Sequence, residues 1–331
     1  MSPLEPPPAT PGPKISDVHA LPQGVHTLRV ERDGVGFWAH VWKGGPGPVL
    51  LVNGATHGDE YEGPELLRRW THTWRPSRLC GTLIAVPVLN EGAFTAGRRV
   101  NPEDGMDLAR AFPGNAGGGP TARVALLFDK ILLSQCTHYV DVHSAGAAYE
   151  LLPWVGFLEC GGSVGVTQRE MAACFGGFWC WAGPYLPGRT LSAAHARNIP
   201  AIYIECSGAG TVRGSEVRRL ESGLKRLMRG IGLIPGGPSR GSSQRFYASV
   251  DRAEAHLQVH HPAPIAGIFV PVRPGFTLGA AVKRGDLLGA VYPVGPGECL
   301  PLVAERSGRI VFLRRQRSVQ AGDAICVVVP V

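Results

Sequence analysis

A histidine and a glutamate three residues apart, His57 and Glu60, follow a short apolar run at residues 49–52 of this 331-residue chain. In a helical turn this spacing brings both side chains to the same side. Two histidines and one glutamate form one of the ligand sets of catalytic zinc sites, which leave a further position open for water. The pair alone is a weak signal, because His-x-x-Glu arises often by chance in solvated turns.

Two further candidates stand at the ends of predicted strands. The run at 138–142 is nearly all apolar and delivers His143 at its carboxyl end, and the run at 199–204 delivers Glu205 in the same way. In open α/β folds, ligands bind beyond the carboxyl ends of the strands. The sequence therefore predicts that these two residues join the His57–Glu60 pair at one edge of a sheet.

Strands alternate with amphipathic helices over the first two thirds of the chain. Apolar residues recur with a period near 3.6 in segments predicted as helices at 60–74, 121–135 and 215–231. Nearly all-apolar strands between such helices are typical of a sheet covered on both faces. The expected fold class is therefore α/β, with a mixed, mostly parallel sheet flanked by helices.

The composition changes at residues 234–243, where Gly, Pro and Ser predict a linker. Beyond it, short strands separated by turns predict a smaller all-β domain at 244–331. Its halves echo each other, as in Lys283-Arg-Gly-Asp286 and Gln320-Ala-Gly-Asp323, and resemble the barrel-sandwich fold of biotinyl and lipoyl carriers. The sequence has no counterpart of the lysine to which those carriers attach their cofactor, so a structural role is expected.

Composition is typical of a globular protein, with 44% hydrophobic and 18% charged residues. Residues 1–14 are Pro-rich, lack the apolar core of a secretory signal and are predicted to be a disordered lead-in, which leaves 15–233 as the α/β domain. A cytoplasmic protein is expected, and no membrane segment, since no apolar stretch approaches about 20 residues. The net charge of +7 comes from scattered basic residues, so nucleic acid is not an expected partner and anionic small molecules fit better.

Four motifs, taken in their order along the chain, resemble one known family. They are His57-Gly-Asp-Glu60, Arg99–Gly114, Asp141-Val-His-Ser144 and Glu205-Cys-Ser-Gly208. Over residues 45–331 the chain resembles the succinylglutamate desuccinylase/aspartoacylase family, a branch of the zinc carboxypeptidase fold, and within it the N-acetyl-diaminobutyrate deacetylases. The resemblance implies a zinc carboxypeptidase-like α/β domain followed by a barrel-sandwich domain.

The resemblance also implies roles for the candidate residues. His57, Glu60 and His143 would bind one zinc ion per chain, and Glu205 would be the general base that takes a proton from water and passes it to the leaving amine. A strand-end carboxylate in a salt bridge is the alternative for Glu205. Asp141 shares a strand face with His143 and is a candidate to orient a zinc ligand.

Two arginines are expected to bind negative charge on the substrate. By the same resemblance, Arg99 faces the scissile carbonyl oxygen and Arg110 binds a carboxylate in a bidentate manner. Arg98 is an alternative to its neighbour Arg99, and a structural ion pair is the alternative for Arg110. The family has Asn before this last arginine, whereas this chain has Ala109, which has no side-chain donor.

The resulting hypothesis is a zinc-dependent amidohydrolase that removes the acyl group from a small N-acyl amino acid or related N-acyl amine. A zinc carboxypeptidase acting on peptides is one alternative. A non-catalytic binding or carrier protein that keeps the fold is the other. The sequence fixes neither the acyl group nor the amine, and it leaves open whether the protein is a homo-oligomer.

Overall fold

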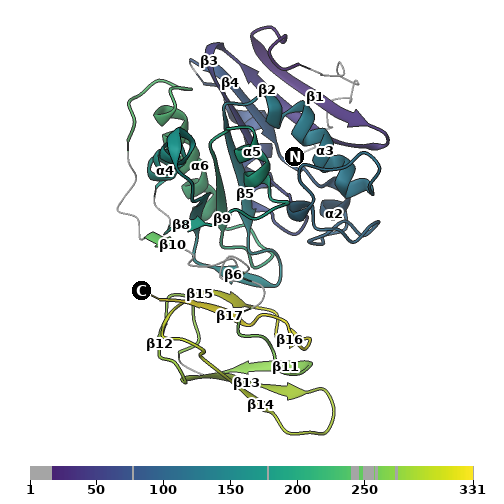
Figure 1. The fold of residues 1–331 in the computed structure, drawn as a ribbon, viewed down its shortest axis with the longest axis vertical. Coiled ribbons are helices and arrows are strands. Elements are labelled where there is room, and N and C mark those ends of the chain that lie inside the picture. Colours follow the sequence, from purple (N-terminus) through teal and green to yellow (C-terminus); the bar gives the residue numbers. More distant parts are fainter. Residues whose placement is uncertain are drawn as a thin grey trace, which may run out of the picture.

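The structure is a computed structural model, and it describes residues 17–76, 78–176, 179–239, 246–248, 257, 260–272 and 275–330. Figure 1 shows a larger body of sheet and helices and a smaller all-β body beneath it, with strand β6 (Tyr149–Leu151) between them. The predicted lead-in at 1–14 and residues 240–243 of the predicted linker lie outside the described residues. Residues 234–239 form neither helix nor strand.

The larger body is built on a nine-stranded sheet in the order β1-β2-β4-β3-β5-β9-β7-β8-β10. Five of its neighbouring pairs are parallel, and the pairs β1–β2, β2–β4 and β7–β9 are antiparallel. The strands are β1 (Gly24–Arg32), β2 (Val35–Lys43), β3 (Gly45–Asn53), β4 (Cys80–Val86), β5 (His138–Ser144), β7 (Trp154–Leu158), β8 (Trp179–Gly183), β9 (Ala201–Cys206) and β10 (Phe246–Ala248). This mixed, mostly parallel sheet confirms the predicted fold class.

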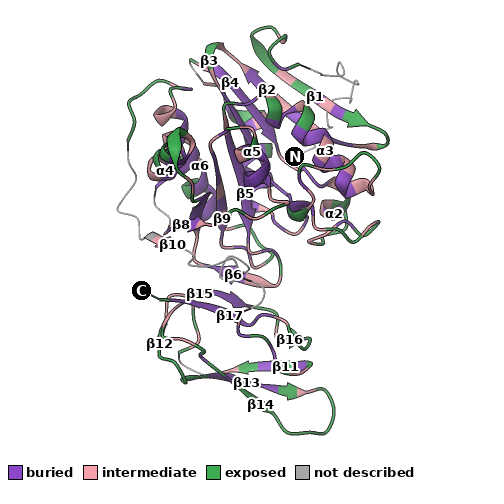
Figure 2. Ribbon diagram, viewed as in Figure 1, coloured by how far each residue is buried: buried purple, intermediate pink, exposed green. Residues whose placement is uncertain are grey.

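Helices cover both faces of the sheet, as Figure 2 shows by the burial of its central strands. One face packs against α1 (Glu62–Thr73), α4 (Gly162–Phe175) and α6 (Gly214–Gly230), and the other against α3 (Pro120–Ile131) and α5 (Thr190–Ala196). Side chains of a strand alternate between faces. In β3, Leu50 and Val52 accordingly enter the first core, whereas Val49 and Leu51 enter the second. The remaining short helices are α2 (Glu91–Thr95), η1 (Leu108–Arg110) and η2 (Leu133–Gln135).

The smaller body consists of two sheets that enclose a separate apolar core. One sheet contains β11 (Gly267–Pro271), β13 (Leu287–Pro293), β14 (Leu300–Val303) and β16 (Ser318–Val319). The other contains β12 (Ala281–Val282), β15 (Gly308–Arg314) and β17 (Cys326–Val329). The strands expected from the sequence in this region are confirmed.

The two bodies exchange strands. β6 lies between β5 and β7 in the chain, yet it pairs antiparallel with β15 of the smaller body. β10 falls inside the range predicted for the C-terminal domain, yet it pairs with β8 of the large sheet. Ion pairs reinforce the junction, because Glu150 of β6 contacts both Arg213 and Arg315. The division into domains at 233 and 244 stays a prediction.

Several elements had no counterpart in the sequence prediction. They are α4, α5, β7 and β8, and the last two carry Trp and Phe side chains with no clear alternation. None of the helices in the described part of the chain combines the length and apolar character needed to span a bilayer.

Packing of α6 on α4 gives a test of the fold. A Cβ atom at Gly223 would lie 2.5–2.7 Å from three ring carbons of Phe175. We expect Gly223→Ala to lower the free energy of unfolding by about 1–2 kcal/mol, because overpacking outweighs the gain in helix propensity. Gly214→Ala in the same helix is the control, since the nearest atom to its added Cβ is an Arg218 nitrogen at 3.4 Å. Urea unfolding measures both, and equal stability of the two variants would contradict the packing argument.

Candidate metal centre

His57 and Glu60 lie in the loop after β3, and the closely packed backbone of this loop fixes their positions. Ala55 adopts a left-handed conformation (φ 47°), and its carbonyl oxygen accepts a hydrogen bond from the Asn90 backbone N–H at 3.0 Å. Gly58 passes so close to Ala93 that an added Cβ would lie 2.0 Å from its carbonyl carbon. Only glycine fits at this close approach, so the spacing of the motif is set by backbone packing.

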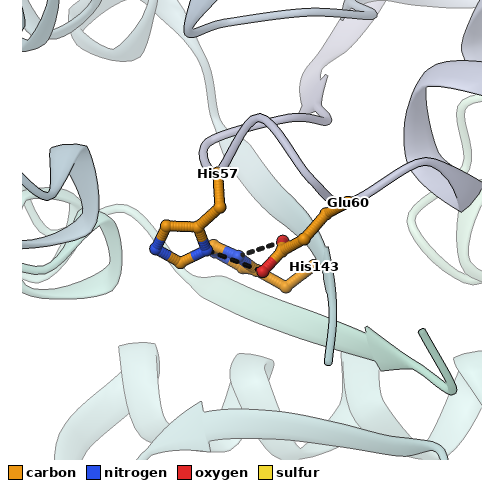
Figure 3. A group of neighbouring side chains, drawn as sticks. All are labelled: His57, Glu60 and His143. Carbon is orange, nitrogen blue, oxygen red and sulfur yellow. Dashed lines mark hydrogen bonds and ion pairs between the residues drawn. The ribbon is translucent and has the colours of Figure 1, made fainter. Parts of the chain in front are cut away.

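The structure brings His57, Glu60 and His143 together, as Figure 3 shows. The Nδ1 atom of His57 lies 2.7 Å from Oε1 of Glu60, and Nδ1 of His143 lies 2.9 Å from Oε2 of the same carboxylate. Their potential ligand atoms all lie within 4.8 Å of one another, and all three residues are buried. Two imidazole nitrogens and a carboxylate oxygen in this arrangement can hold one divalent metal ion.

Each imidazole is held at its far nitrogen by another carboxylate. The Nε2 atom of His57 lies 3.0 Å from Oδ1 of Asp107, and Nε2 of His143 lies 2.9 Å from Oδ2 of Asp141. A carboxylate on the second nitrogen fixes the ring orientation and directs Nδ1 toward a metal. The geometry thus supports the orienting role predicted for Asp141, and it adds Asp107.

Asp141 is itself fixed by a buried hydrogen-bond network. Asn53 and Thr56 donate to its Oδ1 at 2.9 and 3.0 Å, and Thr190 donates to its Oδ2 at 2.6 Å. Burial alone would raise the pKa of Asp141, but His143 and these hydrogen bonds lower it overall. The carboxylate therefore stays ionised although it is fully enclosed.

The ionisable groups of the centre shift the pKa values of one another. Burial lowers the pKa of His143, but the carboxylates of Asp141 and Glu60 outweigh burial and raise it well above the usual value. Burial likewise raises the pKa of Glu60, and the two histidines of the centre lower it by more. The carboxylates of the centre therefore favour positive charge between them, as a metal site requires.

Glu205 lies beside this centre and does not belong to the group of three. It pairs with His143 in the β5–β9 register, so both side chains project from the same face of the sheet. Its side chain borders a cavity, yet the surrounding protein solvates it poorly. Burial raises its pKa to about 8. A carboxyl group with a raised pKa near neutral pH is suited to proton transfer.

The predicted arginines lie in different environments. Arg99 borders the cavity, 3.2 Å from Asp107 and 3.8 Å from Glu60. Arg110 also borders it, with much of its side chain exposed, and partial burial together with the charge of Arg189 lowers its pKa to about 10. Arg98 is exposed and does not line the cavity. A further arginine that the sequence analysis missed, Arg189, lines the cavity, and burial lowers its pKa.

Comparisons with known proteins agree with this arrangement. Residues 46–231 match the model of the succinylglutamate desuccinylase/aspartoacylase catalytic domain. The chain belongs to this family. The predicted family resemblance is thereby confirmed, and the match spans the metal centre, Glu205 and all four arginines. The protein is accordingly a deacylase of this family. It is a hydrolase of amide bonds, with a His-Glu-His group able to hold a metal.

Relatives extend the similarity beyond the catalytic domain. The chain is 28% identical over 301 residues to the N-α-acetyl-L-2,4-diaminobutyric acid deacetylase of Halomonas elongata, covering 88% of this chain and 84% of that protein. The product-bound ectoine utilization protein of Ruegeria pomeroyi superposes with a TM-score of 0.83 at 26% identity, covering 94% and 98% of the two chains. A succinylglutamate desuccinylase from a Silicibacter species gives a TM-score of 0.79 at 26% identity, covering 93% and 96%.

Two residues of the site, Asp107 and Arg189, do not follow a predicted strand, so the search for polar residues at strand ends did not find them. Asp107 lies in a loop and caps η1 by accepting the Ala109 backbone N–H at 2.9 Å, so it reads as an ordinary capping residue. Arg189 precedes α5, a helix that was not predicted. The one feature of the sequence that could have indicated both is that each is a polar residue directly before a short helix.

The role of Asp141 can be tested by metal affinity. We expect Asp141→Asn to weaken zinc binding by about 10- to 100-fold, because the amide no longer holds His143 with a charged acceptor. Asp129→Asn is the matched control: Asp129 is also buried and paired with Arg197, but it belongs to α3, away from the centre. Zinc titration against a competing chelator measures both, with circular dichroism to confirm folding. Wild-type affinity in folded Asp141→Asn would contradict the assignment.

The raised pKa of His143 predicts a proton linked to metal binding. Below that pKa the metal-free protein carries the proton, and the imidazole must lose it before it can bind a cation. Zinc binding should therefore release about one proton near neutral pH, and affinity should rise with pH until the pKa of His143 is passed. Calorimetry in buffers of different ionisation enthalpy measures the release. An observed enthalpy that is independent of buffer would contradict this expectation.

Proposed function

We propose that this protein is a zinc-dependent amidohydrolase that removes the acyl group from a small N-acyl amino acid or related N-acyl amine. The observation that carries the proposal is the buried group of His57, Glu60 and His143 beside the carboxyl group of Glu205. Family membership supports amide hydrolysis, and the names of the relatives point to small N-acyl amino compounds as substrates.

The three side chains fit one zinc ion per chain. Their donor set of two imidazole nitrogens and a carboxylate is one of those found in catalytic zinc sites. A bound zinc ion would polarise the amide carbonyl and lower the pKa of a water to about 7. Asp107 and Asp141 fix the orientation of the two imidazoles that would hold the ion.

Glu205 acts as the proton carrier of the reaction. As a carboxylate it takes the proton from the attacking water, and as an acid it returns that proton to the leaving amine. Burial raises its pKa to about 8, near the pH at which both forms are accessible. A bound dication would lower that pKa and favour the ionised form. Glu205 therefore starts the cycle as the base.

The arginines position the substrate by charge. Arg99 is close enough to the centre to face a carbonyl oxygen that gains negative charge during the attack. Arg110 is available to bind a carboxylate in a fork. Its neighbour Ala109 contributes no side-chain donor, and the Ala109 N–H already binds Asp107. Since Arg98 is exposed and off the cavity, we assign it no contact with the substrate.

Substitution of Glu205 tests this mechanism. We expect Glu205→Gln to lower kcat by at least about 100-fold, because the amide keeps the shape of the side chain but cannot carry the proton. Zinc content should stay near one ion per chain. The control is Glu221→Gln on α6, where the carboxylate pairs with Arg69 and Lys225 far from the chemistry. Release of amine from N-acyl amino acids measures activity, and a fully active Glu205→Gln would refute the role of this residue.

A further inference from the structure

The cavity beside the metal centre has one wall made of aromatic side chains. Trp154 of β7 pairs in register with Glu205 of β9, so its indole lies directly beside the proposed base. Trp181 of β8 pairs with Gly156, two residues along β7, and therefore lies on the same face. The rings of Trp154 and Trp181 lie 5.1 Å apart, and both line the cavity.

Strand β15 of the smaller body, with β6, contributes to the same wall. Phe312 of β15 pairs in register with Leu151 of β6, and both line the cavity. The ring of Tyr149 stacks on Phe312 at 4.7 Å and helps to hold it in place. Trp154, Trp181, Leu151 and Phe312 all belong to the apolar cluster at the junction of the two bodies. We call these four residues the apolar wall.

The cavity lining contains both cationic and apolar side chains. Arg99, Arg110 and Arg189 line it together with the metal-centre residues, whereas the four members of the apolar wall carry no charge. The cavity measures about 220 Å³, many times the roughly 10–15 Å³ that one water occupies on this measure. A substrate that is charged at one end and apolar at the other would fill both parts.

We propose that the acyl group of the natural substrate is apolar and larger than acetyl, either a ring such as phenylacetyl or an aliphatic chain of about six carbons. This rests on the proposed function, in which Arg110 binds a carboxylate of the amino-acid part and Arg99 faces the scissile carbonyl oxygen, so that the apolar wall is left to the rest of the acyl part. The four wall residues are only 1–5% exposed, so each presents a small apolar surface to the cavity. A single methyl group would fill only a small part of the cavity beside them. A succinyl carboxylate would lose its hydration there without a cationic partner among the four wall residues.

The first test measures selectivity in the zinc-loaded wild-type protein. N-acetyl, N-butyryl, N-hexanoyl, N-phenylacetyl and N-succinyl derivatives of one L-amino acid are compared by kcat/KM. Burial of each added methylene should raise kcat/KM by about three- to fourfold. Hexanoyl and phenylacetyl derivatives should thus exceed acetyl by at least tenfold. Highest activity on the acetyl or succinyl derivative would overturn the inference while leaving the proposed deacylase function intact.

The second test locates the selectivity in the apolar wall. In Trp181→Ala, the ratio of kcat/KM for hexanoyl over acetyl should fall at least tenfold. Val327→Ala is the matched control, because Val327 is buried in the same cluster but does not line the cavity, so its ratio should stay within twofold of wild type. An unchanged ratio in Trp181→Ala would overturn the inference. Trp181→Leu, which keeps more volume, replaces it if the alanine variant does not fold.

Binding of product-like acids gives a readout that does not need turnover. Hexanoate and phenylacetate should quench or shift the tryptophan fluorescence of the zinc-loaded protein at concentrations at least tenfold lower than acetate or succinate. If these acids bind as expected and no N-acyl amino acid is hydrolysed, the apolar site stands and the proposed function fails. If the protein hydrolyses the acetyl derivative and all four acids bind alike, the function stands and the inference fails.

Discussion

The carboxylate of Glu60 lies between two imidazole rings, and the rest of the site depends on keeping these three groups together and away from water. Buried charges are costly unless each has a partner. The protein meets this cost with further carboxylates on the outer nitrogens and with neutral donors behind them. Asp141 takes hydrogen bonds from Asn53, Thr56 and Thr190, so the centre is supported through more than one layer of side chains.

Parallel strand pairing makes this support possible. β3, β5 and β9 lie side by side, so their carboxyl ends meet, and the register sets Asn53 against Asp141 and His143 against Glu205. Glu205 and His143 therefore come from neighbouring strands of one sheet. Their relative position is fixed by backbone hydrogen bonds and does not depend on loops.

Strand ends and ordered motifs were sufficient to predict the α/β class and the meeting of His57, Glu60 and His143. Periodicity and apolar runs carry this information locally. The other residues of the site were harder to predict. Asp107 and Arg189 stand in loops, and the residues that they approach are distant in sequence. The strand exchange between the bodies could not be predicted either. Short strands such as β6 and β10 carry no sequence pattern that indicates which strand they pair with.

The exchange of β6 and β10 changes what the duplicated C-terminal fold can do. A carrier arm must swing freely between sites, whereas this body is joined by backbone hydrogen bonds and by ion pairs from Glu150 to Arg213 and Arg315. Fraying of its sheet at β15 would expose one side of the cavity to solvent. A fold that is mobile in carrier proteins is therefore held in place here against the large sheet, and the lining of the cavity depends on residues from both bodies.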